Sequence, residues 1–149
     1  MRRLLVHLMI VLLAGACSIG EALADYGDPV ELAPADLVGA WHGGTQRLIT
    51  FAEGGSFDAK NLPYAAFEGL LPAGFDRTRP VDGSGTWQLD GAGVELTFLR
   101  LGGDEVNAGG PDLNALRQDG VVYLVFFYVD QGNSWTAYRK CTDATAPCP

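Results

Sequence analysis

Short runs of alternating apolar and polar residues, separated by glycine-rich turns, make up most of this chain. Such alternation is typical of strands with one buried face, and glycine supplies the positive φ angles of tight hairpins. A first strand is expected near residues 38–42. The other expected strands are 47–52 paired with 56–60, 85–90 with 94–99, and 113–118 with 121–129, which a further turn joins to 134–140.

The pattern contains about eight strands and no long helix. Between residues 37 and 149, no stretch of ten or more residues has the 3.6-residue period of an amphipathic helix. Parallel strands need such crossover helices, so sequential hairpins are favoured. Closing a meander also removes its exposed strand edges. The sequence therefore predicts an all-β fold, an antiparallel up-and-down meander that forms a barrel or half-barrel.

Two segments interrupt the hairpins. Residues 62–80 are too long for a turn and hold several aromatics, which indicates a lid or binding loop with a short helical turn at 65–71. Residues 102–112 are glycine-rich and acidic, and predict a mobile loop.

The expected strand 121–129 is apolar on both faces. A strand with one face in water would alternate, so this strand should be central and its second face should be covered. Three candidates for the cover are open: residues 62–80, a second copy of the chain, or a bound apolar ligand.

The N-terminus has the organisation of a signal peptide over residues 1–24. Two arginines follow Met1, residues 4–16 are apolar apart from one histidine, and small or polar residues follow. The apolar part is too short for a comfortable transmembrane helix. Cleavage after Ala24 would release the protein, whereas a degenerate lipobox before Cys17 would make that cysteine a lipid anchor. Either outcome predicts an extracytoplasmic protein, secreted or anchored to the outer face of the cell membrane.

Cysteine content agrees with export. Apart from Cys17, the chain has Cys141 and Cys148, and an oxidising compartment favours a disulfide between them. Residues 25–36 are acidic and contain two prolines, so they predict a flexible tether before a β domain at 37–149.

Charge excludes nucleic acid as a partner. The chain has 10 basic and 18 acidic residues. Residues 1–24 contain two of the former and one of the latter, so the processed domain would carry a formal charge of −9. Such a surface repels phosphate backbones and anionic headgroups, which leaves a lipid anchor as the expected route to a membrane. The oligomeric state stays open.

Catalytic and metal-binding patterns are weak. His42 is the single histidine beyond residue 24, so histidine-dependent catalysis and zinc binding lack partners. No catalytic residue, metal or cofactor is therefore expected. The acidic residues near turns leave open an alternative, a hydrolase of envelope polymer with an Asp/Glu pair. These residues are Asp82, Asp90, Asp104, Glu105, Asp112, Asp119 and Asp130.

Gly39-Ala40-Trp41 resembles the G-x-W motif on the first strand of lipocalin-like proteins. In that superfamily a basic residue on the last strand packs across the tryptophan, and the resemblance assigns this structural role to Arg139. Residues 83–87, Gly-Ser-Gly-Thr-Trp, are similar to a motif in small exported actinobacterial β proteins of unknown function. The resemblance implies a lipocalin-like barrel whose interior holds a small apolar molecule.

The expected function is that of an exported, non-catalytic binding domain for a small apolar ligand or a protein partner. A secreted inhibitor or accessory domain is a further alternative. Aromatic side chains could line a ligand pocket or simply fill the core. The candidate ligand-binding residues are Tyr64, Phe67, Phe75, Trp87 and Tyr123.

Overall fold

A computed structural model of the chain describes residues 26–44, 46–128 and 134–141, and its strands form one ten-stranded antiparallel sheet. The strands are β1 (Asp28–Pro29), β2 (Gly39–Gly43), β3 (Arg47–Phe51), β4 (Ser56–Leu62), β5 (Val81–Asp90), β6 (Gly93–Leu101), β7 (Asp104–Gly109), β8 (Leu113–Gln118), β9 (Val121–Tyr128) and β10 (Ser134–Lys140). The helical elements are α2 (Pro34–Leu37), α3 (Tyr64–Phe67) and the 3₁₀ turn η2 (Glu68–Leu70).

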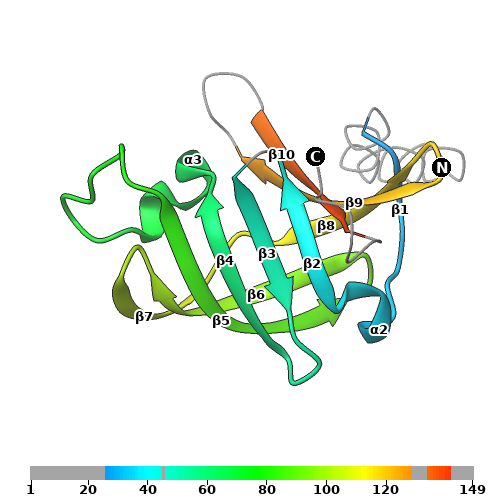
Figure 1. Cartoon of the computed structure of the whole chain (residues 1–149), viewed down its shortest axis with the longest axis horizontal. Helices are drawn as coiled ribbons and strands as arrows, with labels where there is room; N and C mark the ends of the chain where they lie inside the picture. The colour runs from blue at the N-terminus through cyan, green and yellow to red at the C-terminus, as the bar shows by residue number, and fades with distance from the viewer. Residues whose placement is uncertain (1–25, 45, 129–133, 142–149) are drawn as a thin grey trace, which may run out of the picture.

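Eight of these strands close into a barrel, as the sequence predicts. Strands β2, β3, β4, β5 and β6 pair in sequence order, and so do β8, β9 and β10. The two groups join where β10 pairs with β2 and where β8 pairs with β6. In Figure 1, β2 to β5 form the wall nearest the viewer, and β8 and β9 cross behind them. Between β8 and β9, Asp119 and Gly120 have φ angles of 51° and 79°, as a two-residue hairpin turn requires.

The prediction of a mobile loop at residues 102–112 is wrong, because most of this segment forms strand β7. β7 pairs with the second half of β6, whereas β8 takes over at Gly93 and Val94, the first residues of β6. Most β7 side chains are exposed, so its sequence lacks the apolar alternation of a half-buried strand. Its regularity comes from backbone pairing with β6, a long-range contact that a local pattern does not reveal.

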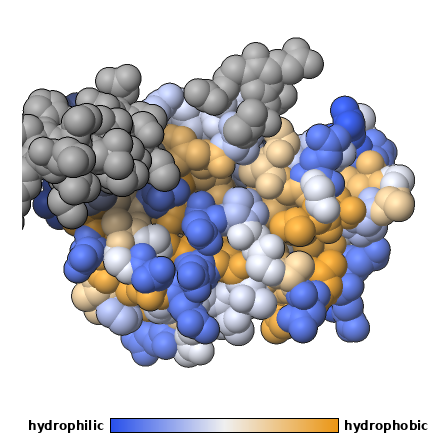
Figure 2. Space-filling view, turned by 180° about the vertical axis from the view of Figure 1, so that it is seen from behind, coloured by the Kyte–Doolittle hydropathy of each residue, from blue (hydrophilic) through white to orange (hydrophobic). Residues whose placement is uncertain are grey.

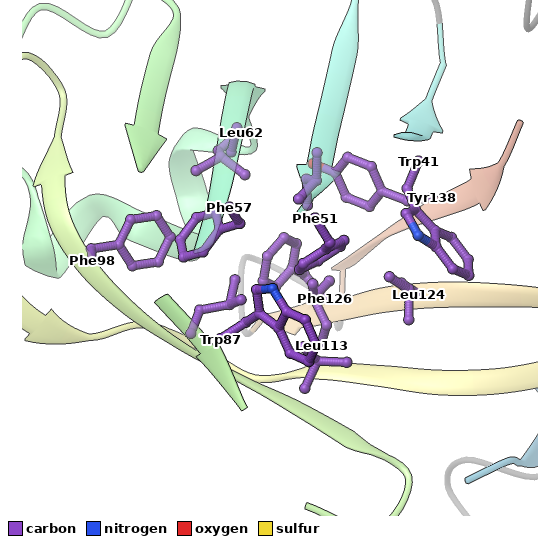
Figure 3. Packing of buried hydrophobic residues seen from close by; sticks show 14 of the residues in the cluster. Trp41, Phe51, Phe57, Leu62, Trp87, Phe98, Leu113, Leu124, Phe126 and Tyr138 are labelled. Atoms are coloured by element: carbon purple, nitrogen blue, oxygen red, sulfur yellow. The ribbon is translucent and has the colours of Figure 1, made fainter. Parts of the chain in front are cut away.

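Large side chains from all around the barrel meet in its interior (Figure 3). Phe98 contacts the rings of Phe57 and Phe67 at centroid distances of 5.0 and 5.3 Å. Phe126 contacts Phe67 at 5.4 Å and Tyr138 at 5.9 Å. The interior is thus packed with aromatic rings from β4, β6, β9, β10 and α3.

The helical turn predicted at 65–71 is present as α3 and η2, at the opposite end of the barrel from α2 (Figure 1). Phe67 is fully buried between β6 and β9. Residues 62–80, the first candidate cover for β9, therefore contribute to covering its inner face. The outer face of β9 has other neighbours, described below.

Residues 28–36, most of the segment predicted to be a tether, lie along the barrel. β1 pairs with β8, and the Val30 amide donates to the Ala115 carbonyl at 2.9 Å. Val30 and Leu32 pack against the core, and Leu37 at the end of α2 is fully buried. We call residues 28–36 the N-terminal strap. Apolar side chains spaced two residues apart dock this acidic segment against the barrel end.

Several predictions concern residues outside the described ranges. The signal peptide at 1–24, lipidation of Cys17 and a disulfide from Cys141 to Cys148 all involve such residues, so they stay predictions. Among the described residues, no helix is long and apolar enough to cross a membrane.

Candidate functional site

The five predicted ligand-binding aromatics do not form one site. Phe67 and Trp87 belong to the buried core, and the Trp87 indole N–H donates to the Ser56 carbonyl at 3.0 Å. Tyr64 and Phe75 stack on each other at 6.4 Å in the 62–80 segment. Tyr123 lies on the outer side of β9, opposite Arg139 of β10. The structure thus separates these residues into core, surface cluster and outer wall.

A hollow lies instead at the α2 end of the barrel, between the N-terminal strap and strands β8, β9, β10 and β2. It has a volume of about 480 Å³, within the range of small-molecule sites. We call it the strap cleft. Its lining residues are Val30, Glu31, Leu32, Asp36, Trp41, Arg117, Gly120, Val121, Val122, Arg139 and Lys140.

Strand register brings cationic and apolar side chains to the same wall of the cleft. Arg117 of β8 lies opposite Val122 of β9, and Lys140 of β10 lies opposite Trp41 of β2. Residues opposite each other on paired strands share a face of the sheet. Val122 and Trp41 pack against or within the core, so Arg117 and Lys140 lie on the inward side at this end of the barrel.

Lys140, not the predicted Arg139, is the cation over Trp41. Its Nζ lies 5.9 Å from the indole centroid and donates to the Asp36 carbonyl at 2.5 Å. Gly39, at φ +122°, lies beneath the lysine, since an added Cβ would be 3.3 Å from Lys140 Cε. Neighbouring strand residues face opposite sides, so Arg139 is directed to the outer wall beside Tyr123.

The Trp41 indole is also held from the strap side. Its N–H donates to the Leu37 carbonyl at 2.7 Å, and the side chain is buried. This bond joins the end of α2 to β2 and fixes one edge of the cleft.

The cleft brings cations and carboxylates together with few ion pairs between them. Arg117 and Arg139 form no ion pair with a carboxylate in the described part of the chain, although Asp28 lies opposite Arg117 in β1. Two carboxylates line the cleft. Asp36 accepts a bond from the Ala33 amide at 3.2 Å, and Glu31 has no ion-pair partner within the described ranges. Arg139 borders the cleft from the outer wall, so Arg117 and Lys140 are the cations directed into it, beside the carboxylates of Glu31 and Asp36.

A second hollow of about 330 Å³ lies on the outer wall formed by β9 and β10. Tyr26 contacts the rings of Phe127 and Trp135 at 5.2 and 5.7 Å, and Trp135 is 49% exposed. We call Tyr26, Tyr123, Phe127 and Trp135 the outer aromatic face. Figure 2 shows hydrophobic residues on the side of the molecule that includes β8 and β9.

Among the other candidate residues from the sequence, Asp82 has a structural role. Asp82 accepts bonds from Lys60 Nζ at 3.1 Å and the Asn61 amide at 3.0 Å. His42 is half-buried on β2, opposite Leu48 and Arg139. In the described ranges, no group of three or more His, Cys, Asp or Glu side chains could hold a metal ion.

Neither a protein-family model, nor a curated protein, nor a solved structure matches this chain. Sequence reasoning missed Arg117, Val122 and Leu32 as cleft residues, because strap docking brings together three distant segments. The available signal was the apolar pair Val30 and Leu32 within an otherwise acidic and proline-containing stretch.

Proposed function

We propose that this chain is an exported, non-catalytic, lipocalin-like barrel that binds a small, largely apolar molecule in the strap cleft. Export is supported by the signal-like N-terminus and the cysteine pair. The lipocalin-like assignment is supported by the eight-stranded barrel and by the G-x-W tryptophan beneath a cation of the last strand.

One observation carries the choice of site. Aromatic rings pack across the barrel interior, whereas the strap cleft offers about 480 Å³ beside Trp41. Placing a ligand among the packed rings would require displacing buried side chains at a large cost in packing. The cleft accepts a ligand without that rearrangement.

Native mass spectrometry of the processed protein from its own host tests this proposal. The expected result is a non-covalent adduct of small-molecule mass, in a spectrum that also reveals acylation at Cys17. Val121→Trp fills the cleft and should abolish the adduct. Glu95→Trp introduces the same side chain at an exposed strand position on β6 and should retain it.

An adduct that persists in Val121→Trp would contradict binding in the cleft. So would a host-purified protein with no small molecule that also takes up no apolar ligand when one is supplied.

A second candidate function is supported by the outer aromatic face, which favours a protein partner. Exposed tryptophan and tyrosine are enriched where proteins bind one another. A photo-crosslinking amino acid in place of Trp135 tests it in host cells. Leu99 on β6 is the matched control, because both side chains are 49% exposed.

A discrete cross-linked product from position 135 that is absent from position 99 would support the partner. Equal, diffuse labelling at the two positions would contradict it.

A further inference from the structure

We infer that the strap cleft selects an anionic amphiphile, a molecule with one acidic head group on an apolar body; this inference rests on the proposed function. The acidic head would lie between Arg117 and Lys140. The apolar body would lie against Val121, Val122 and the strap.

The head-group position follows from the cations. Arg117 and Lys140 lie on β8 and β10, the two neighbours of β9, and both line the cleft. Arg117 is exposed and free of ion pairs with any described carboxylate, so its guanidinium is available to an incoming anion. Carboxylates and phosphates accept two parallel hydrogen bonds from such a group.

Lys140 contributes a fixed charge. Its contacts with Trp41 and the Asp36 carbonyl hold the ammonium group at the inner edge of the cleft, and neither contact neutralises its charge. A cation held in place before binding loses little side-chain freedom when an anion arrives.

The apolar body is indicated by the remaining wall. Val30 and Leu32 of the strap line the same hollow as Val121 and Val122, and all four side chains are partly exposed. A free inorganic anion would leave this apolar surface in water, whereas a chain or ring attached to the acid would cover it.

Because the chain is acidic overall, the cations of the cleft distinguish it from most of the protein surface as a place for an anion. The chain carries a net charge of −8, and long-range repulsion disfavours anions over most of its surface. In the cleft, the two inward cations Arg117 and Lys140 equal the two carboxylates Glu31 and Asp36 in number, whereas the whole chain has 10 basic and 18 acidic residues. An anion without apolar contacts would gain little there, so the head group and the body must act together.

Isothermal titration calorimetry with the processed, delipidated protein tests the inference, using decanoate, 1-decanol and decyltrimethylammonium as probes of equal chain length. We expect decanoate to bind about fivefold to tenfold more tightly than 1-decanol, and the cationic probe to bind most weakly. Arg117→Gln should remove most of the preference for decanoate. Arg100→Gln makes the same charge change on exposed β6, outside the cleft, and should preserve it.

Equal binding of decanoate and 1-decanol would overturn the anionic head group and leave the proposed apolar site standing. Equal weakening by Arg117→Gln and Arg100→Gln would overturn it too, because the preference would then reflect overall charge. If none of the three probes bound, both the inference and the proposed ligand site would fall. Circular dichroism and thermal melting of each variant confirm that the comparison uses folded protein.

Discussion

Lys140 Nζ lies 5.9 Å from the centroid of the Trp41 ring, which links the last strand of the barrel to the first. The same ammonium donates to the Asp36 carbonyl, so one side chain joins β10, β2 and the strap. The lysine is both a part of the fold and a wall of the cleft.

Replacing Lys140 with alanine should destabilise the barrel. The loss of the contact with Trp41 is expected to lower the free energy of unfolding by about 1 kcal/mol. Arg139→Ala should change it by less than about 0.5 kcal/mol, since the arginine side chain is exposed on the outer wall. Urea denaturation measures both. A larger effect from Arg139→Ala would contradict the observed register.

Phe67→Ala should be among the most damaging substitutions in the chain. The ring is fully buried between Phe98 and Phe126, so its removal should cost about 3–5 kcal/mol of stability. Tyr64→Ala on the same helix is the control, because Tyr64 is only partly buried and should cost much less. Similar thermal melting for the two variants would contradict a barrel end closed by Phe67.

Tyr138 should make the fold sensitive to alkaline pH. Its hydroxyl is buried without a hydrogen-bond partner, and burial raises the pKa of this phenol above its ordinary value near 10. The unfolded chain therefore loses the phenol proton first. Stability should be intact below about pH 10 and fall as pH rises above it.

Tyr138→Phe removes this contribution and the unpaired hydroxyl together. We expect its stability near neutral pH to equal or exceed that of the parent chain. Above about pH 10 its free energy of unfolding should fall less steeply than that of the parent. Parallel pH dependences in urea denaturation would show that Tyr138 does not titrate on unfolding.

The predicted disulfide has a simple test. Intact-mass measurement of the exported protein should show the loss of two hydrogens, and Cys141→Ser should abolish that difference. Closing so short a loop is worth about 2.5 kcal/mol in the chain-entropy model, so the variant should melt at a lower temperature. An unchanged mass after reduction would mean that the bond does not form.

Strand positions were predictable because most strands alternate apolar and polar residues between glycine turns, and β9 is a continuous apolar run between two turns. The structure confirms β2, β3, β4, β8, β9 and β10 within a few residues of their expected positions. β7 was not predictable, because an exposed edge strand needs no apolar alternation. Arg139 was misassigned by one residue, and on a strand that displacement moves a side chain to the opposite face.

The location of the cleft was harder to foresee. A local pattern shows which side chains are inward, but not whether their combined volume fills the barrel. Phe67 fills part of the interior from the helix α3, which is not one of the barrel strands. At the other end of the barrel, Val30 and Leu32 of the strap pack against the core. Both contacts join segments far apart in the chain, so the choice between filled core and internal pocket required the structure.

The position of a bound ligand distinguishes most directly between the strap cleft and the barrel interior. Methyl-labelled leucine and valine side chains can be followed by NMR while decanoate is added. We predict saturable shifts at Leu32 and Val122, with Leu96 and Leu113 in the core unchanged. Shifts at Leu96 and Leu113, with Leu32 and Val122 unaffected, would place the ligand inside the barrel and contradict binding at the cleft.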